Sequence, residues 1–166
     1  MTPLLVSACL LGLNTRYNAE TKTNAQVVAL IEQADIMPII VCPEQLAGFS
    51  TPRPSCEFIQ GSGEQVWRGT GQLKNSLGDD VTAAFCRGAQ ETLTIARMTH
   101  CRIALLKERS PSCGSRFIHC QGELCPGQGV TTVLLHQEGL RLFSEEQLDE
   151  LQEYLGNNNR SIPPKP

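Results

Sequence analysis

Leu4-Leu5-Val6-Ser7-Ala8-Cys9 is the first of three short apolar runs in the chain that each lead to a cysteine. The second is Pro38-Ile39-Ile40-Val41-Cys42, and the third, Ile103-Ala104-Leu105-Leu106, is followed after a polar loop by Cys113. Strands buried on both faces of a parallel sheet read as continuous apolar runs, and such sheets hold ligands beyond the carboxyl ends of their strands. If the three runs are neighbouring parallel strands, the thiols of Cys9, Cys42 and Cys113 converge.

Two helical patterns lie between these runs. Thr23 or Asn24 can cap a helix whose apolar positions extend to Ala34, and Asp79 or Asp80 can cap a longer helix with apolar spacing from Val81 to Ala96. Strand–helix–strand units with right-handed crossovers place successive parallel strands in one sheet. The sequence therefore predicts an α/β fold, a Rossmann-like three-layer α/β/α arrangement with a mostly parallel sheet.

The remaining segments give less regular patterns. We expect a long functional loop from Pro43 to Gln72, within which Phe58-Ile59 and Gln65-Val66-Trp67 can form a hairpin. A helix over Val130–Gln137 and a strand over Leu140–Phe143 follow. Ser144 to Gln147 matches a capping box for a final helix that ends near Gly156. Residues 1–156 are then one domain, and residues 157–166 a flexible C-terminal tail.

Composition limits the classes of function. The 166 residues carry a formal net charge of −3, which does not provide the broad cationic surface that nucleic-acid binding usually needs, so a small-molecule partner is expected. Neither a signal peptide nor an apolar run of about 20 residues is present, which favours a cytoplasmic protein without a membrane anchor. Eight cysteines in such a compartment are free thiols or metal-bound thiolates. The sequence does not indicate the oligomeric state.

The eight cysteines differ in their surroundings. A free cysteine is commonly a small buried hydrophobic residue, and this interpretation suits Cys86, within the long helix, and Cys101, beside a strand. Cys9, Cys42 and Cys113 instead lie in loops rich in polar residues, Gly and Pro. These three are the candidates for a site.

The ordered motifs of the chain resemble those of the thiouracil desulfidase family. The resemblance runs from about Leu4 to Leu148, and its motifs are Val6-Ser7-Ala8-Cys9-Leu10-Leu11-Gly12, Cys42-Pro43-Glu44-Gln45-Leu46, Thr51-Pro52-Arg53-Pro54, Asp80-Val81-Thr82, Leu106-Lys107-Glu108-Arg109-Ser110-Pro111-Ser112-Cys113-Gly114 and Gly129-Val130-Thr131. It implies an enzyme that removes sulfur from 2-thiouracil or a related thiopyrimidine with a [4Fe-4S] cluster. Cys9, Cys42 and Cys113 would be the cluster ligands, matching the three cysteines that the strand pattern selects.

The resemblance also suggests how the remaining site residues act. With three protein ligands, one iron is open to the soft thiocarbonyl sulfur of the substrate, which would polarise the carbon–sulfur bond toward attack by water. Glu44 is the candidate to activate water or relay a proton, and Ser110 to bind substrate or transfer a proton. Arg53 and Ser7 are the candidate substrate-binding residues.

Two positions depart from the family pattern and keep an alternative open. Thr15 stands where many members have a further cysteine, and Cys56 where a small or apolar residue is common. Cys56 could supply the fourth thiolate of a closed zinc site, which would make the chain a zinc-binding or thiol redox-sensing module instead of an enzyme. Cys120 and Cys125 have no role that the sequence assigns.

Overall fold

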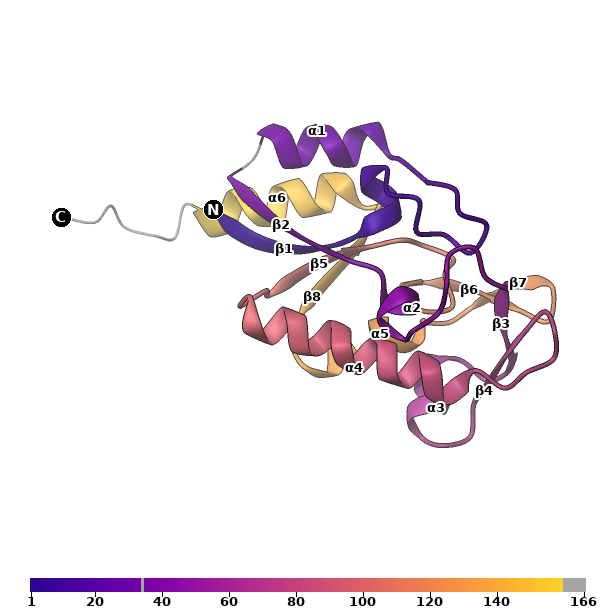
Figure 1. The fold of residues 1–166 in the computed structure, drawn as a ribbon. Helices are drawn as coiled ribbons and strands as arrows, with labels where there is room; N and C mark the ends of the chain where they lie inside the picture. The colour runs from indigo at the N-terminus through magenta and orange to yellow at the C-terminus, as the bar shows by residue number, and fades with distance from the viewer. Residues whose placement is uncertain (34, 160–166) are drawn as a thin grey trace.

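A four-stranded parallel sheet forms the centre of the fold (Figure 1). The computed structural model of the chain describes residues 1–33 and 35–159. The sheet has the order β2-β1-β5-β8, and its strands are β1 (Thr2–Ser7), β2 (Ile36–Val41), β5 (Ile103–Leu106) and β8 (Arg141–Ser144). The three apolar runs are therefore neighbouring parallel strands, as predicted, with β1 between the other two.

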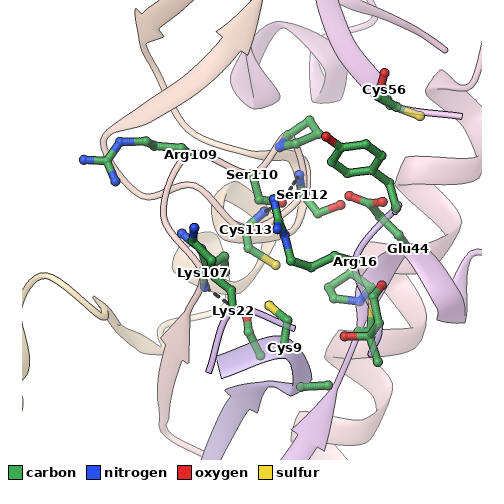
Figure 2. Close-up of a pocket in the computed structure, with 18 of the residues that line it drawn as sticks. Cys9, Arg16, Lys22, Glu44, Cys56, Lys107, Arg109, Ser110, Ser112 and Cys113 are labelled. Carbon is green, nitrogen blue, oxygen red and sulfur yellow. Dashed lines mark hydrogen bonds between the residues drawn. The ribbon is translucent and has the colours of Figure 1, made fainter. Parts of the chain in front are cut away.

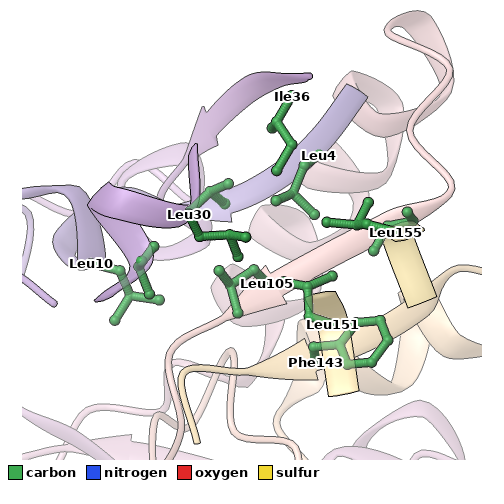
Figure 3. Close-up of a cluster of buried hydrophobic side chains, with 11 residues drawn as sticks. Leu4, Leu10, Leu30, Ile36, Leu105, Phe143, Leu151 and Leu155 are labelled. Atoms are coloured by element: carbon green, nitrogen blue, oxygen red, sulfur yellow. The ribbon is translucent and has the colours of Figure 1, made fainter. Parts of the chain in front are cut away.

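Helices cover both faces of this sheet, which confirms the predicted three-layer α/β/α arrangement (Figure 1). One face is covered by α1 (Ala25–Gln33) and α6 (Leu148–Asn159), and the other by α4 (Thr82–Met98) and α5 (Val130–Gln137). Successive strand residues point to opposite faces, so Leu4 and Leu105 pack toward α1 and α6 (Figure 3), whereas Leu5 packs toward α4 and α5. Both faces being apolar explains the continuous hydrophobic runs.

The predicted cap of the first helix is present, whereas the N-cap position of α4 is Val81, one residue after the predicted Asp80. Oδ1 of Asn24 accepts hydrogen bonds from the amides of Gln26 and Val27 at the start of α1, and Oδ1 of Asp80 accepts one from the amide of Thr82 at the start of α4. These side chains satisfy donors that have no partner within the helix. The bounds of α5 agree with the prediction, and β8 lies one residue later than expected. Ala34 lies outside the described residues.

A second sheet, which the sequence did not predict, packs against the ends of α4 and α5. Its order is β4-β3-β6-β7, from β3 (Cys56–Gln60), β4 (Gln72–Asn75), β6 (Phe117–Cys120) and β7 (Glu123–Pro126). Its buried side chains, including Phe58, Leu73 and Ile118, share a core cluster with Phe85 of α4 and Val130 of α5. The cluster fixes this sheet beside the carboxyl ends of the central strands.

The prediction of a long loop from Pro43 to Gln72 is therefore wrong in part. The segment contains α2 (Pro43–Leu46), β3 and α3 (Gly63–Trp67). The expected hairpin between Phe58-Ile59 and Gln65–Trp67 is also wrong, because β3 pairs with β4. The amide of Ser62 donates to Oε1 of Gln65, a reciprocal cap that starts α3 and prevents a strand there.

The C-terminal helix is longer than expected. It begins at Leu148 and continues through Asn159, past the predicted end near Gly156, and residues 160–166 of the expected tail lie outside the described residues. The predicted contact between Ser144 and Gln147 forms, but it closes a turn before the helix and does not cap its first residue. Within the described ranges, no helix is long and apolar enough to span a membrane.

Gly88 allows α4 to pack directly on α2, the short helix that follows Cys42. A Cβ at position 88 would lie 2.1 Å from the carbonyl oxygen of Pro43. We predict that Gly88→Ala lowers the free energy of unfolding by about 1–3 kcal/mol, because the two helices must move apart. Urea unfolding followed by circular dichroism measures it.

Gly156→Ala is the matched control, because Gly156 is exposed on α6 and a Cβ there meets no heavy atom within 4 Å. This variant should be neutral or more stable by up to about 1 kcal/mol, as alanine favours helix. Equal unfolding free energies for wild type and Gly88→Ala would contradict the close packing.

Candidate functional site

The carboxyl ends of β1, β2 and β5 bring three cysteines to one cavity, of about 580 Å³. Cys9 lies in a 3-10 helix, η1 (Ala8–Leu11), directly after β1, and Cys42 directly follows β2. Cys113 lies in the long loop between β5 and β6. All three line the cavity, and in Figure 2 the thiols of Cys9 and Cys113 point toward one another. The predicted convergence of the thiols is observed.

Each cysteine is held by backbone contacts. The Cys9 carbonyl accepts the amide of Lys22 at 3.0 Å, and the Cys42 thiol lies 3.8 Å from the carbonyl oxygen of Thr15. The Cys113 carbonyl accepts the hydroxyl of Thr132 at 2.8 Å. Because Thr132 belongs to the first turn of α5, this helix fixes the end of the Cys113 loop.

Burial favours the neutral form of these thiols. Burial, and then the charge of Cys42, raise the pKa of Cys9 to about 11, while the positive charge of Lys107 opposes the shift. Burial likewise raises the pKa of Cys113, and a hydrogen bond from Ser7 opposes it. The charges of Cys9 and Cys42 both act on Cys113, which shows that the three sulfur atoms are electrostatic neighbours.

A buried carboxylate organises the loop that carries Cys113. The Glu108 side chain is fully buried and accepts the amides of Ser115, Arg116 and Phe117 at 3.0–3.1 Å, together with the Ser115 hydroxyl. Burial acts to raise the Glu108 pKa, but these hydrogen bonds outweigh it and lower the pKa. Glu108 therefore ties both ends of the 108–117 loop together as an ionised group.

Glu44 and Arg53 form a buried ion pair at the cavity wall. Nε of Arg53 lies 2.7 Å from Oε2 of Glu44, and their side chains are 4% and 14% exposed. The rest of the guanidinium donates to the carbonyls of Ser50 and Thr15 and to the hydroxyl of Thr51. Arg53 is thus committed to protein partners, whereas Glu44 keeps one oxygen outside this pair.

The two predicted serines, Ser110 and Ser7, line the cavity and make different hydrogen bonds. Oγ of Ser110 accepts the amides of Ser112 and Cys113, both at 3.2 Å, so it closes the turn that presents Cys113. Oγ of Ser7 accepts the amide of Lys107 at 3.0 Å and contacts the Cys113 thiol. Ser7 is buried, and it joins the ends of β1 and β5 beneath Cys113.

Basic residues gather around the thiols. Lys22 and Lys107 lie next to Cys9, and Arg16 approaches from the opposite wall (Figure 2). Lys107 also pairs with Glu145, and its Nζ lies 2.9 Å from the carbonyl oxygen of Glu108. Arg109 points away from the thiols and pairs with Glu146 (Figure 2). The charges of Lys107 and Arg16 lower the pKa of Cys9, and the charge of Glu145 opposes them.

The donor set fits an iron–sulfur cluster better than a single ion. Among residues 1–33 and 35–159, no three His, Cys, Asp or Glu side chains are grouped closely enough to hold one metal ion. Thiolates that share a zinc ion lie about 2.3 Å from it, so the closed zinc site with Cys56 is not favoured. Cys56 lines the cavity but stands apart from Cys9 and Cys113 (Figure 2). Three thiols on separate walls suit a larger sulfur-bridged group.

Comparison with known proteins agrees with this geometry. The family model described as 2-thiouracil desulfurase matches residues 4–147. The chain belongs to the 2-thiouracil desulfurase family. It is 40% identical over 151 residues to the protein YbbK of Bacillus subtilis (strain 168), covering 89% of this chain and 99% of that one.

A solved structure also resembles this member of the 2-thiouracil desulfurase family. It is described as the [4Fe-4S]-dependent thiouracil desulfidase TudS and superposes with a TM-score of 0.78 at 38% sequence identity. The match covers 94% of this chain and 99% of that one. The similarity therefore extends over both sheets and is not confined to the site.

Several residues of this desulfurase site could not be selected from the sequence. Glu108 lies within a quoted motif, but its role depends on amides that only the folded loop gathers around it. The carbonyl of Thr15, which contacts both Cys42 and Arg53, leaves no side-chain signal. Tyr17 and His119 complete the cavity wall from a loop and from the unpredicted second sheet.

We predict that Glu108→Gln lowers the free energy of unfolding at pH 7 by about 1–3 kcal/mol, because an amide group faces donors that require an acceptor. The folded pKa of Glu108 is lowered, so its contribution is present above the unfolded pKa, near 4.3, and is lost as pH falls through the folded value. The difference between wild type and variant should therefore shrink in acid.

Urea titrations at pH 7 and at several acidic pH values measure the effect. Exposed Glu91 on α4 supplies the control variant Glu91→Gln, which should match wild type at each pH. A constant difference between wild type and Glu108→Gln across the acidic range would show that the ionised carboxylate is not what stabilises the loop.

Proposed function

We propose that this chain is a [4Fe-4S]-dependent desulfidase that removes sulfur hydrolytically from 2-thiouracil or a related thiopyrimidine. Cys9, Cys42 and Cys113 would hold the cluster. The observation that carries the proposal is the convergence of these thiols in one cavity that Glu44 and Ser110 also line. Family membership and the similarity to a protein described as a [4Fe-4S]-dependent thiouracil desulfidase support it.

The proposed reaction is a substitution without net oxidation. A thiocarbonyl and water give a carbonyl and sulfide, so the ring carbon gains an oxygen atom as it loses sulfur. A cluster with three protein ligands supplies an open iron that can bind the soft thiocarbonyl sulfur and withdraw charge from the carbon–sulfur bond. The protein must then place water, accept its proton and exclude competing ligands.

Glu44 is the proposed general base. It belongs to the first turn of α2, two residues after Cys42, so the same short helix fixes its position relative to a ligand. Arg53 holds Oε2 at 2.7 Å, and we assign Oε1 to the water that attacks the ring carbon. A carboxylate needs hydrogen-bond reach to the proton that it removes, and the fixed ion pair restricts Glu44 to one orientation.

Ser110 is the proposed donor to the substrate ring. Its oxygen already accepts two amides, and its hydroxyl hydrogen can therefore be directed into the cavity. 2-Thiouracil carries a carbonyl oxygen that can accept such a hydrogen bond. In this role Ser110 would orient the ring while it closes the Cys113 turn.

The structure suggests positioning roles for the two proposed substrate-binding residues. Because Arg53 donates to Glu44, Ser50, Thr51 and Thr15, we propose that it orients Glu44 and does not bind substrate directly. Ser7 lies beneath Cys113, and we propose that it supports this ligand. The polar and charged lining of the cavity supports a small, polar thiopyrimidine as the proposed partner. We infer a reducing compartment, the cytoplasm, from eight free thiols.

Replacement of the proposed ligands tests the function. Anaerobic reconstitution of wild type should give about four irons per chain, and uracil should form from 2-thiouracil, as measured by chromatography. Cys9→Ala, Cys42→Ala and Cys113→Ala should each lose bound iron, acid-labile sulfide and uracil formation. Cys56→Ala is the matched control, since Cys56 lines the same cavity, and it should keep all three.

Two outcomes would contradict this assignment. One is stoichiometric zinc with little acid-labile sulfide in protein purified without oxygen, together with zinc loss in Cys56→Ala. The other is full iron binding by any of the three ligand variants. Full cluster content without uracil formation would leave the ligands in place and disprove the proposed substrate.

Replacement of Glu44 tests the proposed base separately from the cluster. Glu44→Gln should lower kcat by about 10²–10⁴-fold, the usual contribution of a general base, and keep the iron content of wild type. Arg53→Lys should give a smaller loss of kcat and keep the iron content of wild type, because lysine cannot fix Oε2 with the same geometry. Steady-state rates from pH 5 to 9 measure both.

Wild-type kcat in Glu44→Gln at normal iron content would exclude the role. Glu91→Gln is a suitable control for the loss of one negative charge, since Glu91 is exposed on α4 and does not line the cavity.

A further inference from the structure

The β6–β7 hairpin (Figure 1) contains two further cysteines, Cys120 and Cys125, which do not line the cavity of the proposed active site. In the antiparallel register Ile118 pairs with Cys125, and Cys120 pairs with Glu123. Since alternate residues share a face of a strand, Cys120 and Cys125 lie on the same face, at diagonal positions. That face also carries Ile118, which is fully buried, so the thiols point toward the protein and not into open solvent.

The turn of the hairpin holds the two thiols close together. Gln121 and Gly122 have φ values of 49° and 81°, as in a two-residue turn that suits the right-handed twist of a hairpin. The turn is anchored to β3, because the amide of Gly122 donates to Oε2 of Glu57 at 2.6 Å and the amide of Gln121 donates to the carbonyl of Phe58 at 3.1 Å. The turn and its anchoring fix the strand register that places Cys120 and Cys125 at diagonal positions.

The pair is accessible from a second cavity, of about 520 Å³, which both thiols line. Both residues are half-buried. Burial, and then the hydrogen bond and charge of Cys125, raise the pKa of Cys120 to about 11. The thiol of Cys125 is therefore a direct neighbour of the thiol of Cys120. Either thiol can react first, because the other lies beside it.

We propose that Cys120 and Cys125 form a reversible dithiol–disulfide pair that reacts with small disulfides such as glutathione disulfide. The thiolate of one cysteine of the pair attacks one sulfur of the oxidant, which releases one glutathione thiolate and leaves a mixed disulfide on the protein. The other cysteine loses its proton to solvent and attacks the protein sulfur of that mixed disulfide, which releases the second glutathione. Two protein thiols are oxidised and one glutathione disulfide is reduced, so no metal or further co-reactant is needed.

A disulfide in this hairpin would form beside the cavity of the proposed active site. His119, between the strand positions of Ile118 and Cys120, lines the cavity that holds Cys9, Cys42 and Cys113. The hairpin is also inserted directly after the Cys113 loop, whose last amide, from Phe117, binds Glu108. The pair is nevertheless separate from the proposed ligands, and the proposal stands whether or not the chain holds a cluster.

The sequence allows a direct test by mass spectrometry. Cleavage after Arg116 and Arg141 yields a peptide, residues 117–141, that contains Cys120 and Cys125 and no other cysteine. Anaerobically prepared holoprotein is equilibrated with glutathione and glutathione disulfide at a series of ratios, quenched with an alkylating reagent and digested. We expect this peptide to lose two hydrogen atoms and to escape alkylation as the oxidised fraction rises, and to recover with added glutathione.

Single-cysteine variants show whether the pairing is specific. In Cys120→Ser the reaction should stop at a mixed disulfide on Cys125, at glutathione disulfide concentrations about tenfold higher than wild type needs, because no neighbouring thiol completes the exchange. Cys86→Ser removes a thiol from α4 and should behave as wild type. The proposal is overturned if the wild-type peptide carries two glutathione groups, remains fully alkylated at every ratio, or cross-links through Cys56.

Discussion

The parallel pairing of β1 with β2 and β5 is the constraint on which the site depends. Ser7 pairs with Val41, and Val6 with Leu105, so the three strands end within one or two residues of the same edge. A shift of one residue in either register would exchange the side chains that pack on the two helix layers. Because both faces of β1 are fully buried, the packing against α1, α6, α4 and α5 specifies the register strongly.

The three thiols require different amounts of support from the rest of the fold. Cys42 follows its strand directly, and the packing of α2 on α4 at Gly88 is sufficient to hold it. Cys113 lies seven residues beyond the end of β5, where the strand no longer determines its position. The buried carboxylate of Glu108 and the first turn of α5 supply that missing constraint. The hydrogen bonds of Glu108 and Thr132 thus hold the cysteine that lies farthest along the chain from its strand.

The central sheet and its thiols could be predicted because their signals are local and strong. Apolar runs such as Leu4–Val6 and capping residues such as Asn24 each identify their own element. The second sheet could not be predicted, because its strands are short and half-exposed and because Phe58 meets Cys120 across 62 residues of sequence. Ser62 and Gln65 did carry a cap signal for α3, and Gln121-Gly122 a turn signal for the β6–β7 hairpin. The ion pair of Arg53 with Glu44 depends on three-dimensional proximity that spacing does not reveal.

The electrostatics of the cavity suit thiols that ionise only when they gain a partner. Burial disfavours the thiolate at Cys9 and Cys113, while Lys107 and Arg16 favour it at Cys9. These two effects oppose each other at Cys9, and burial outweighs the positive charges there. Bonding to a metal replaces the proton of a thiol and stabilises the thiolate, which burial alone disfavours. Metal binding therefore releases protons at such sites. The positive charges of Lys107 and Arg16 then lie near an anionic group instead of neutral thiols.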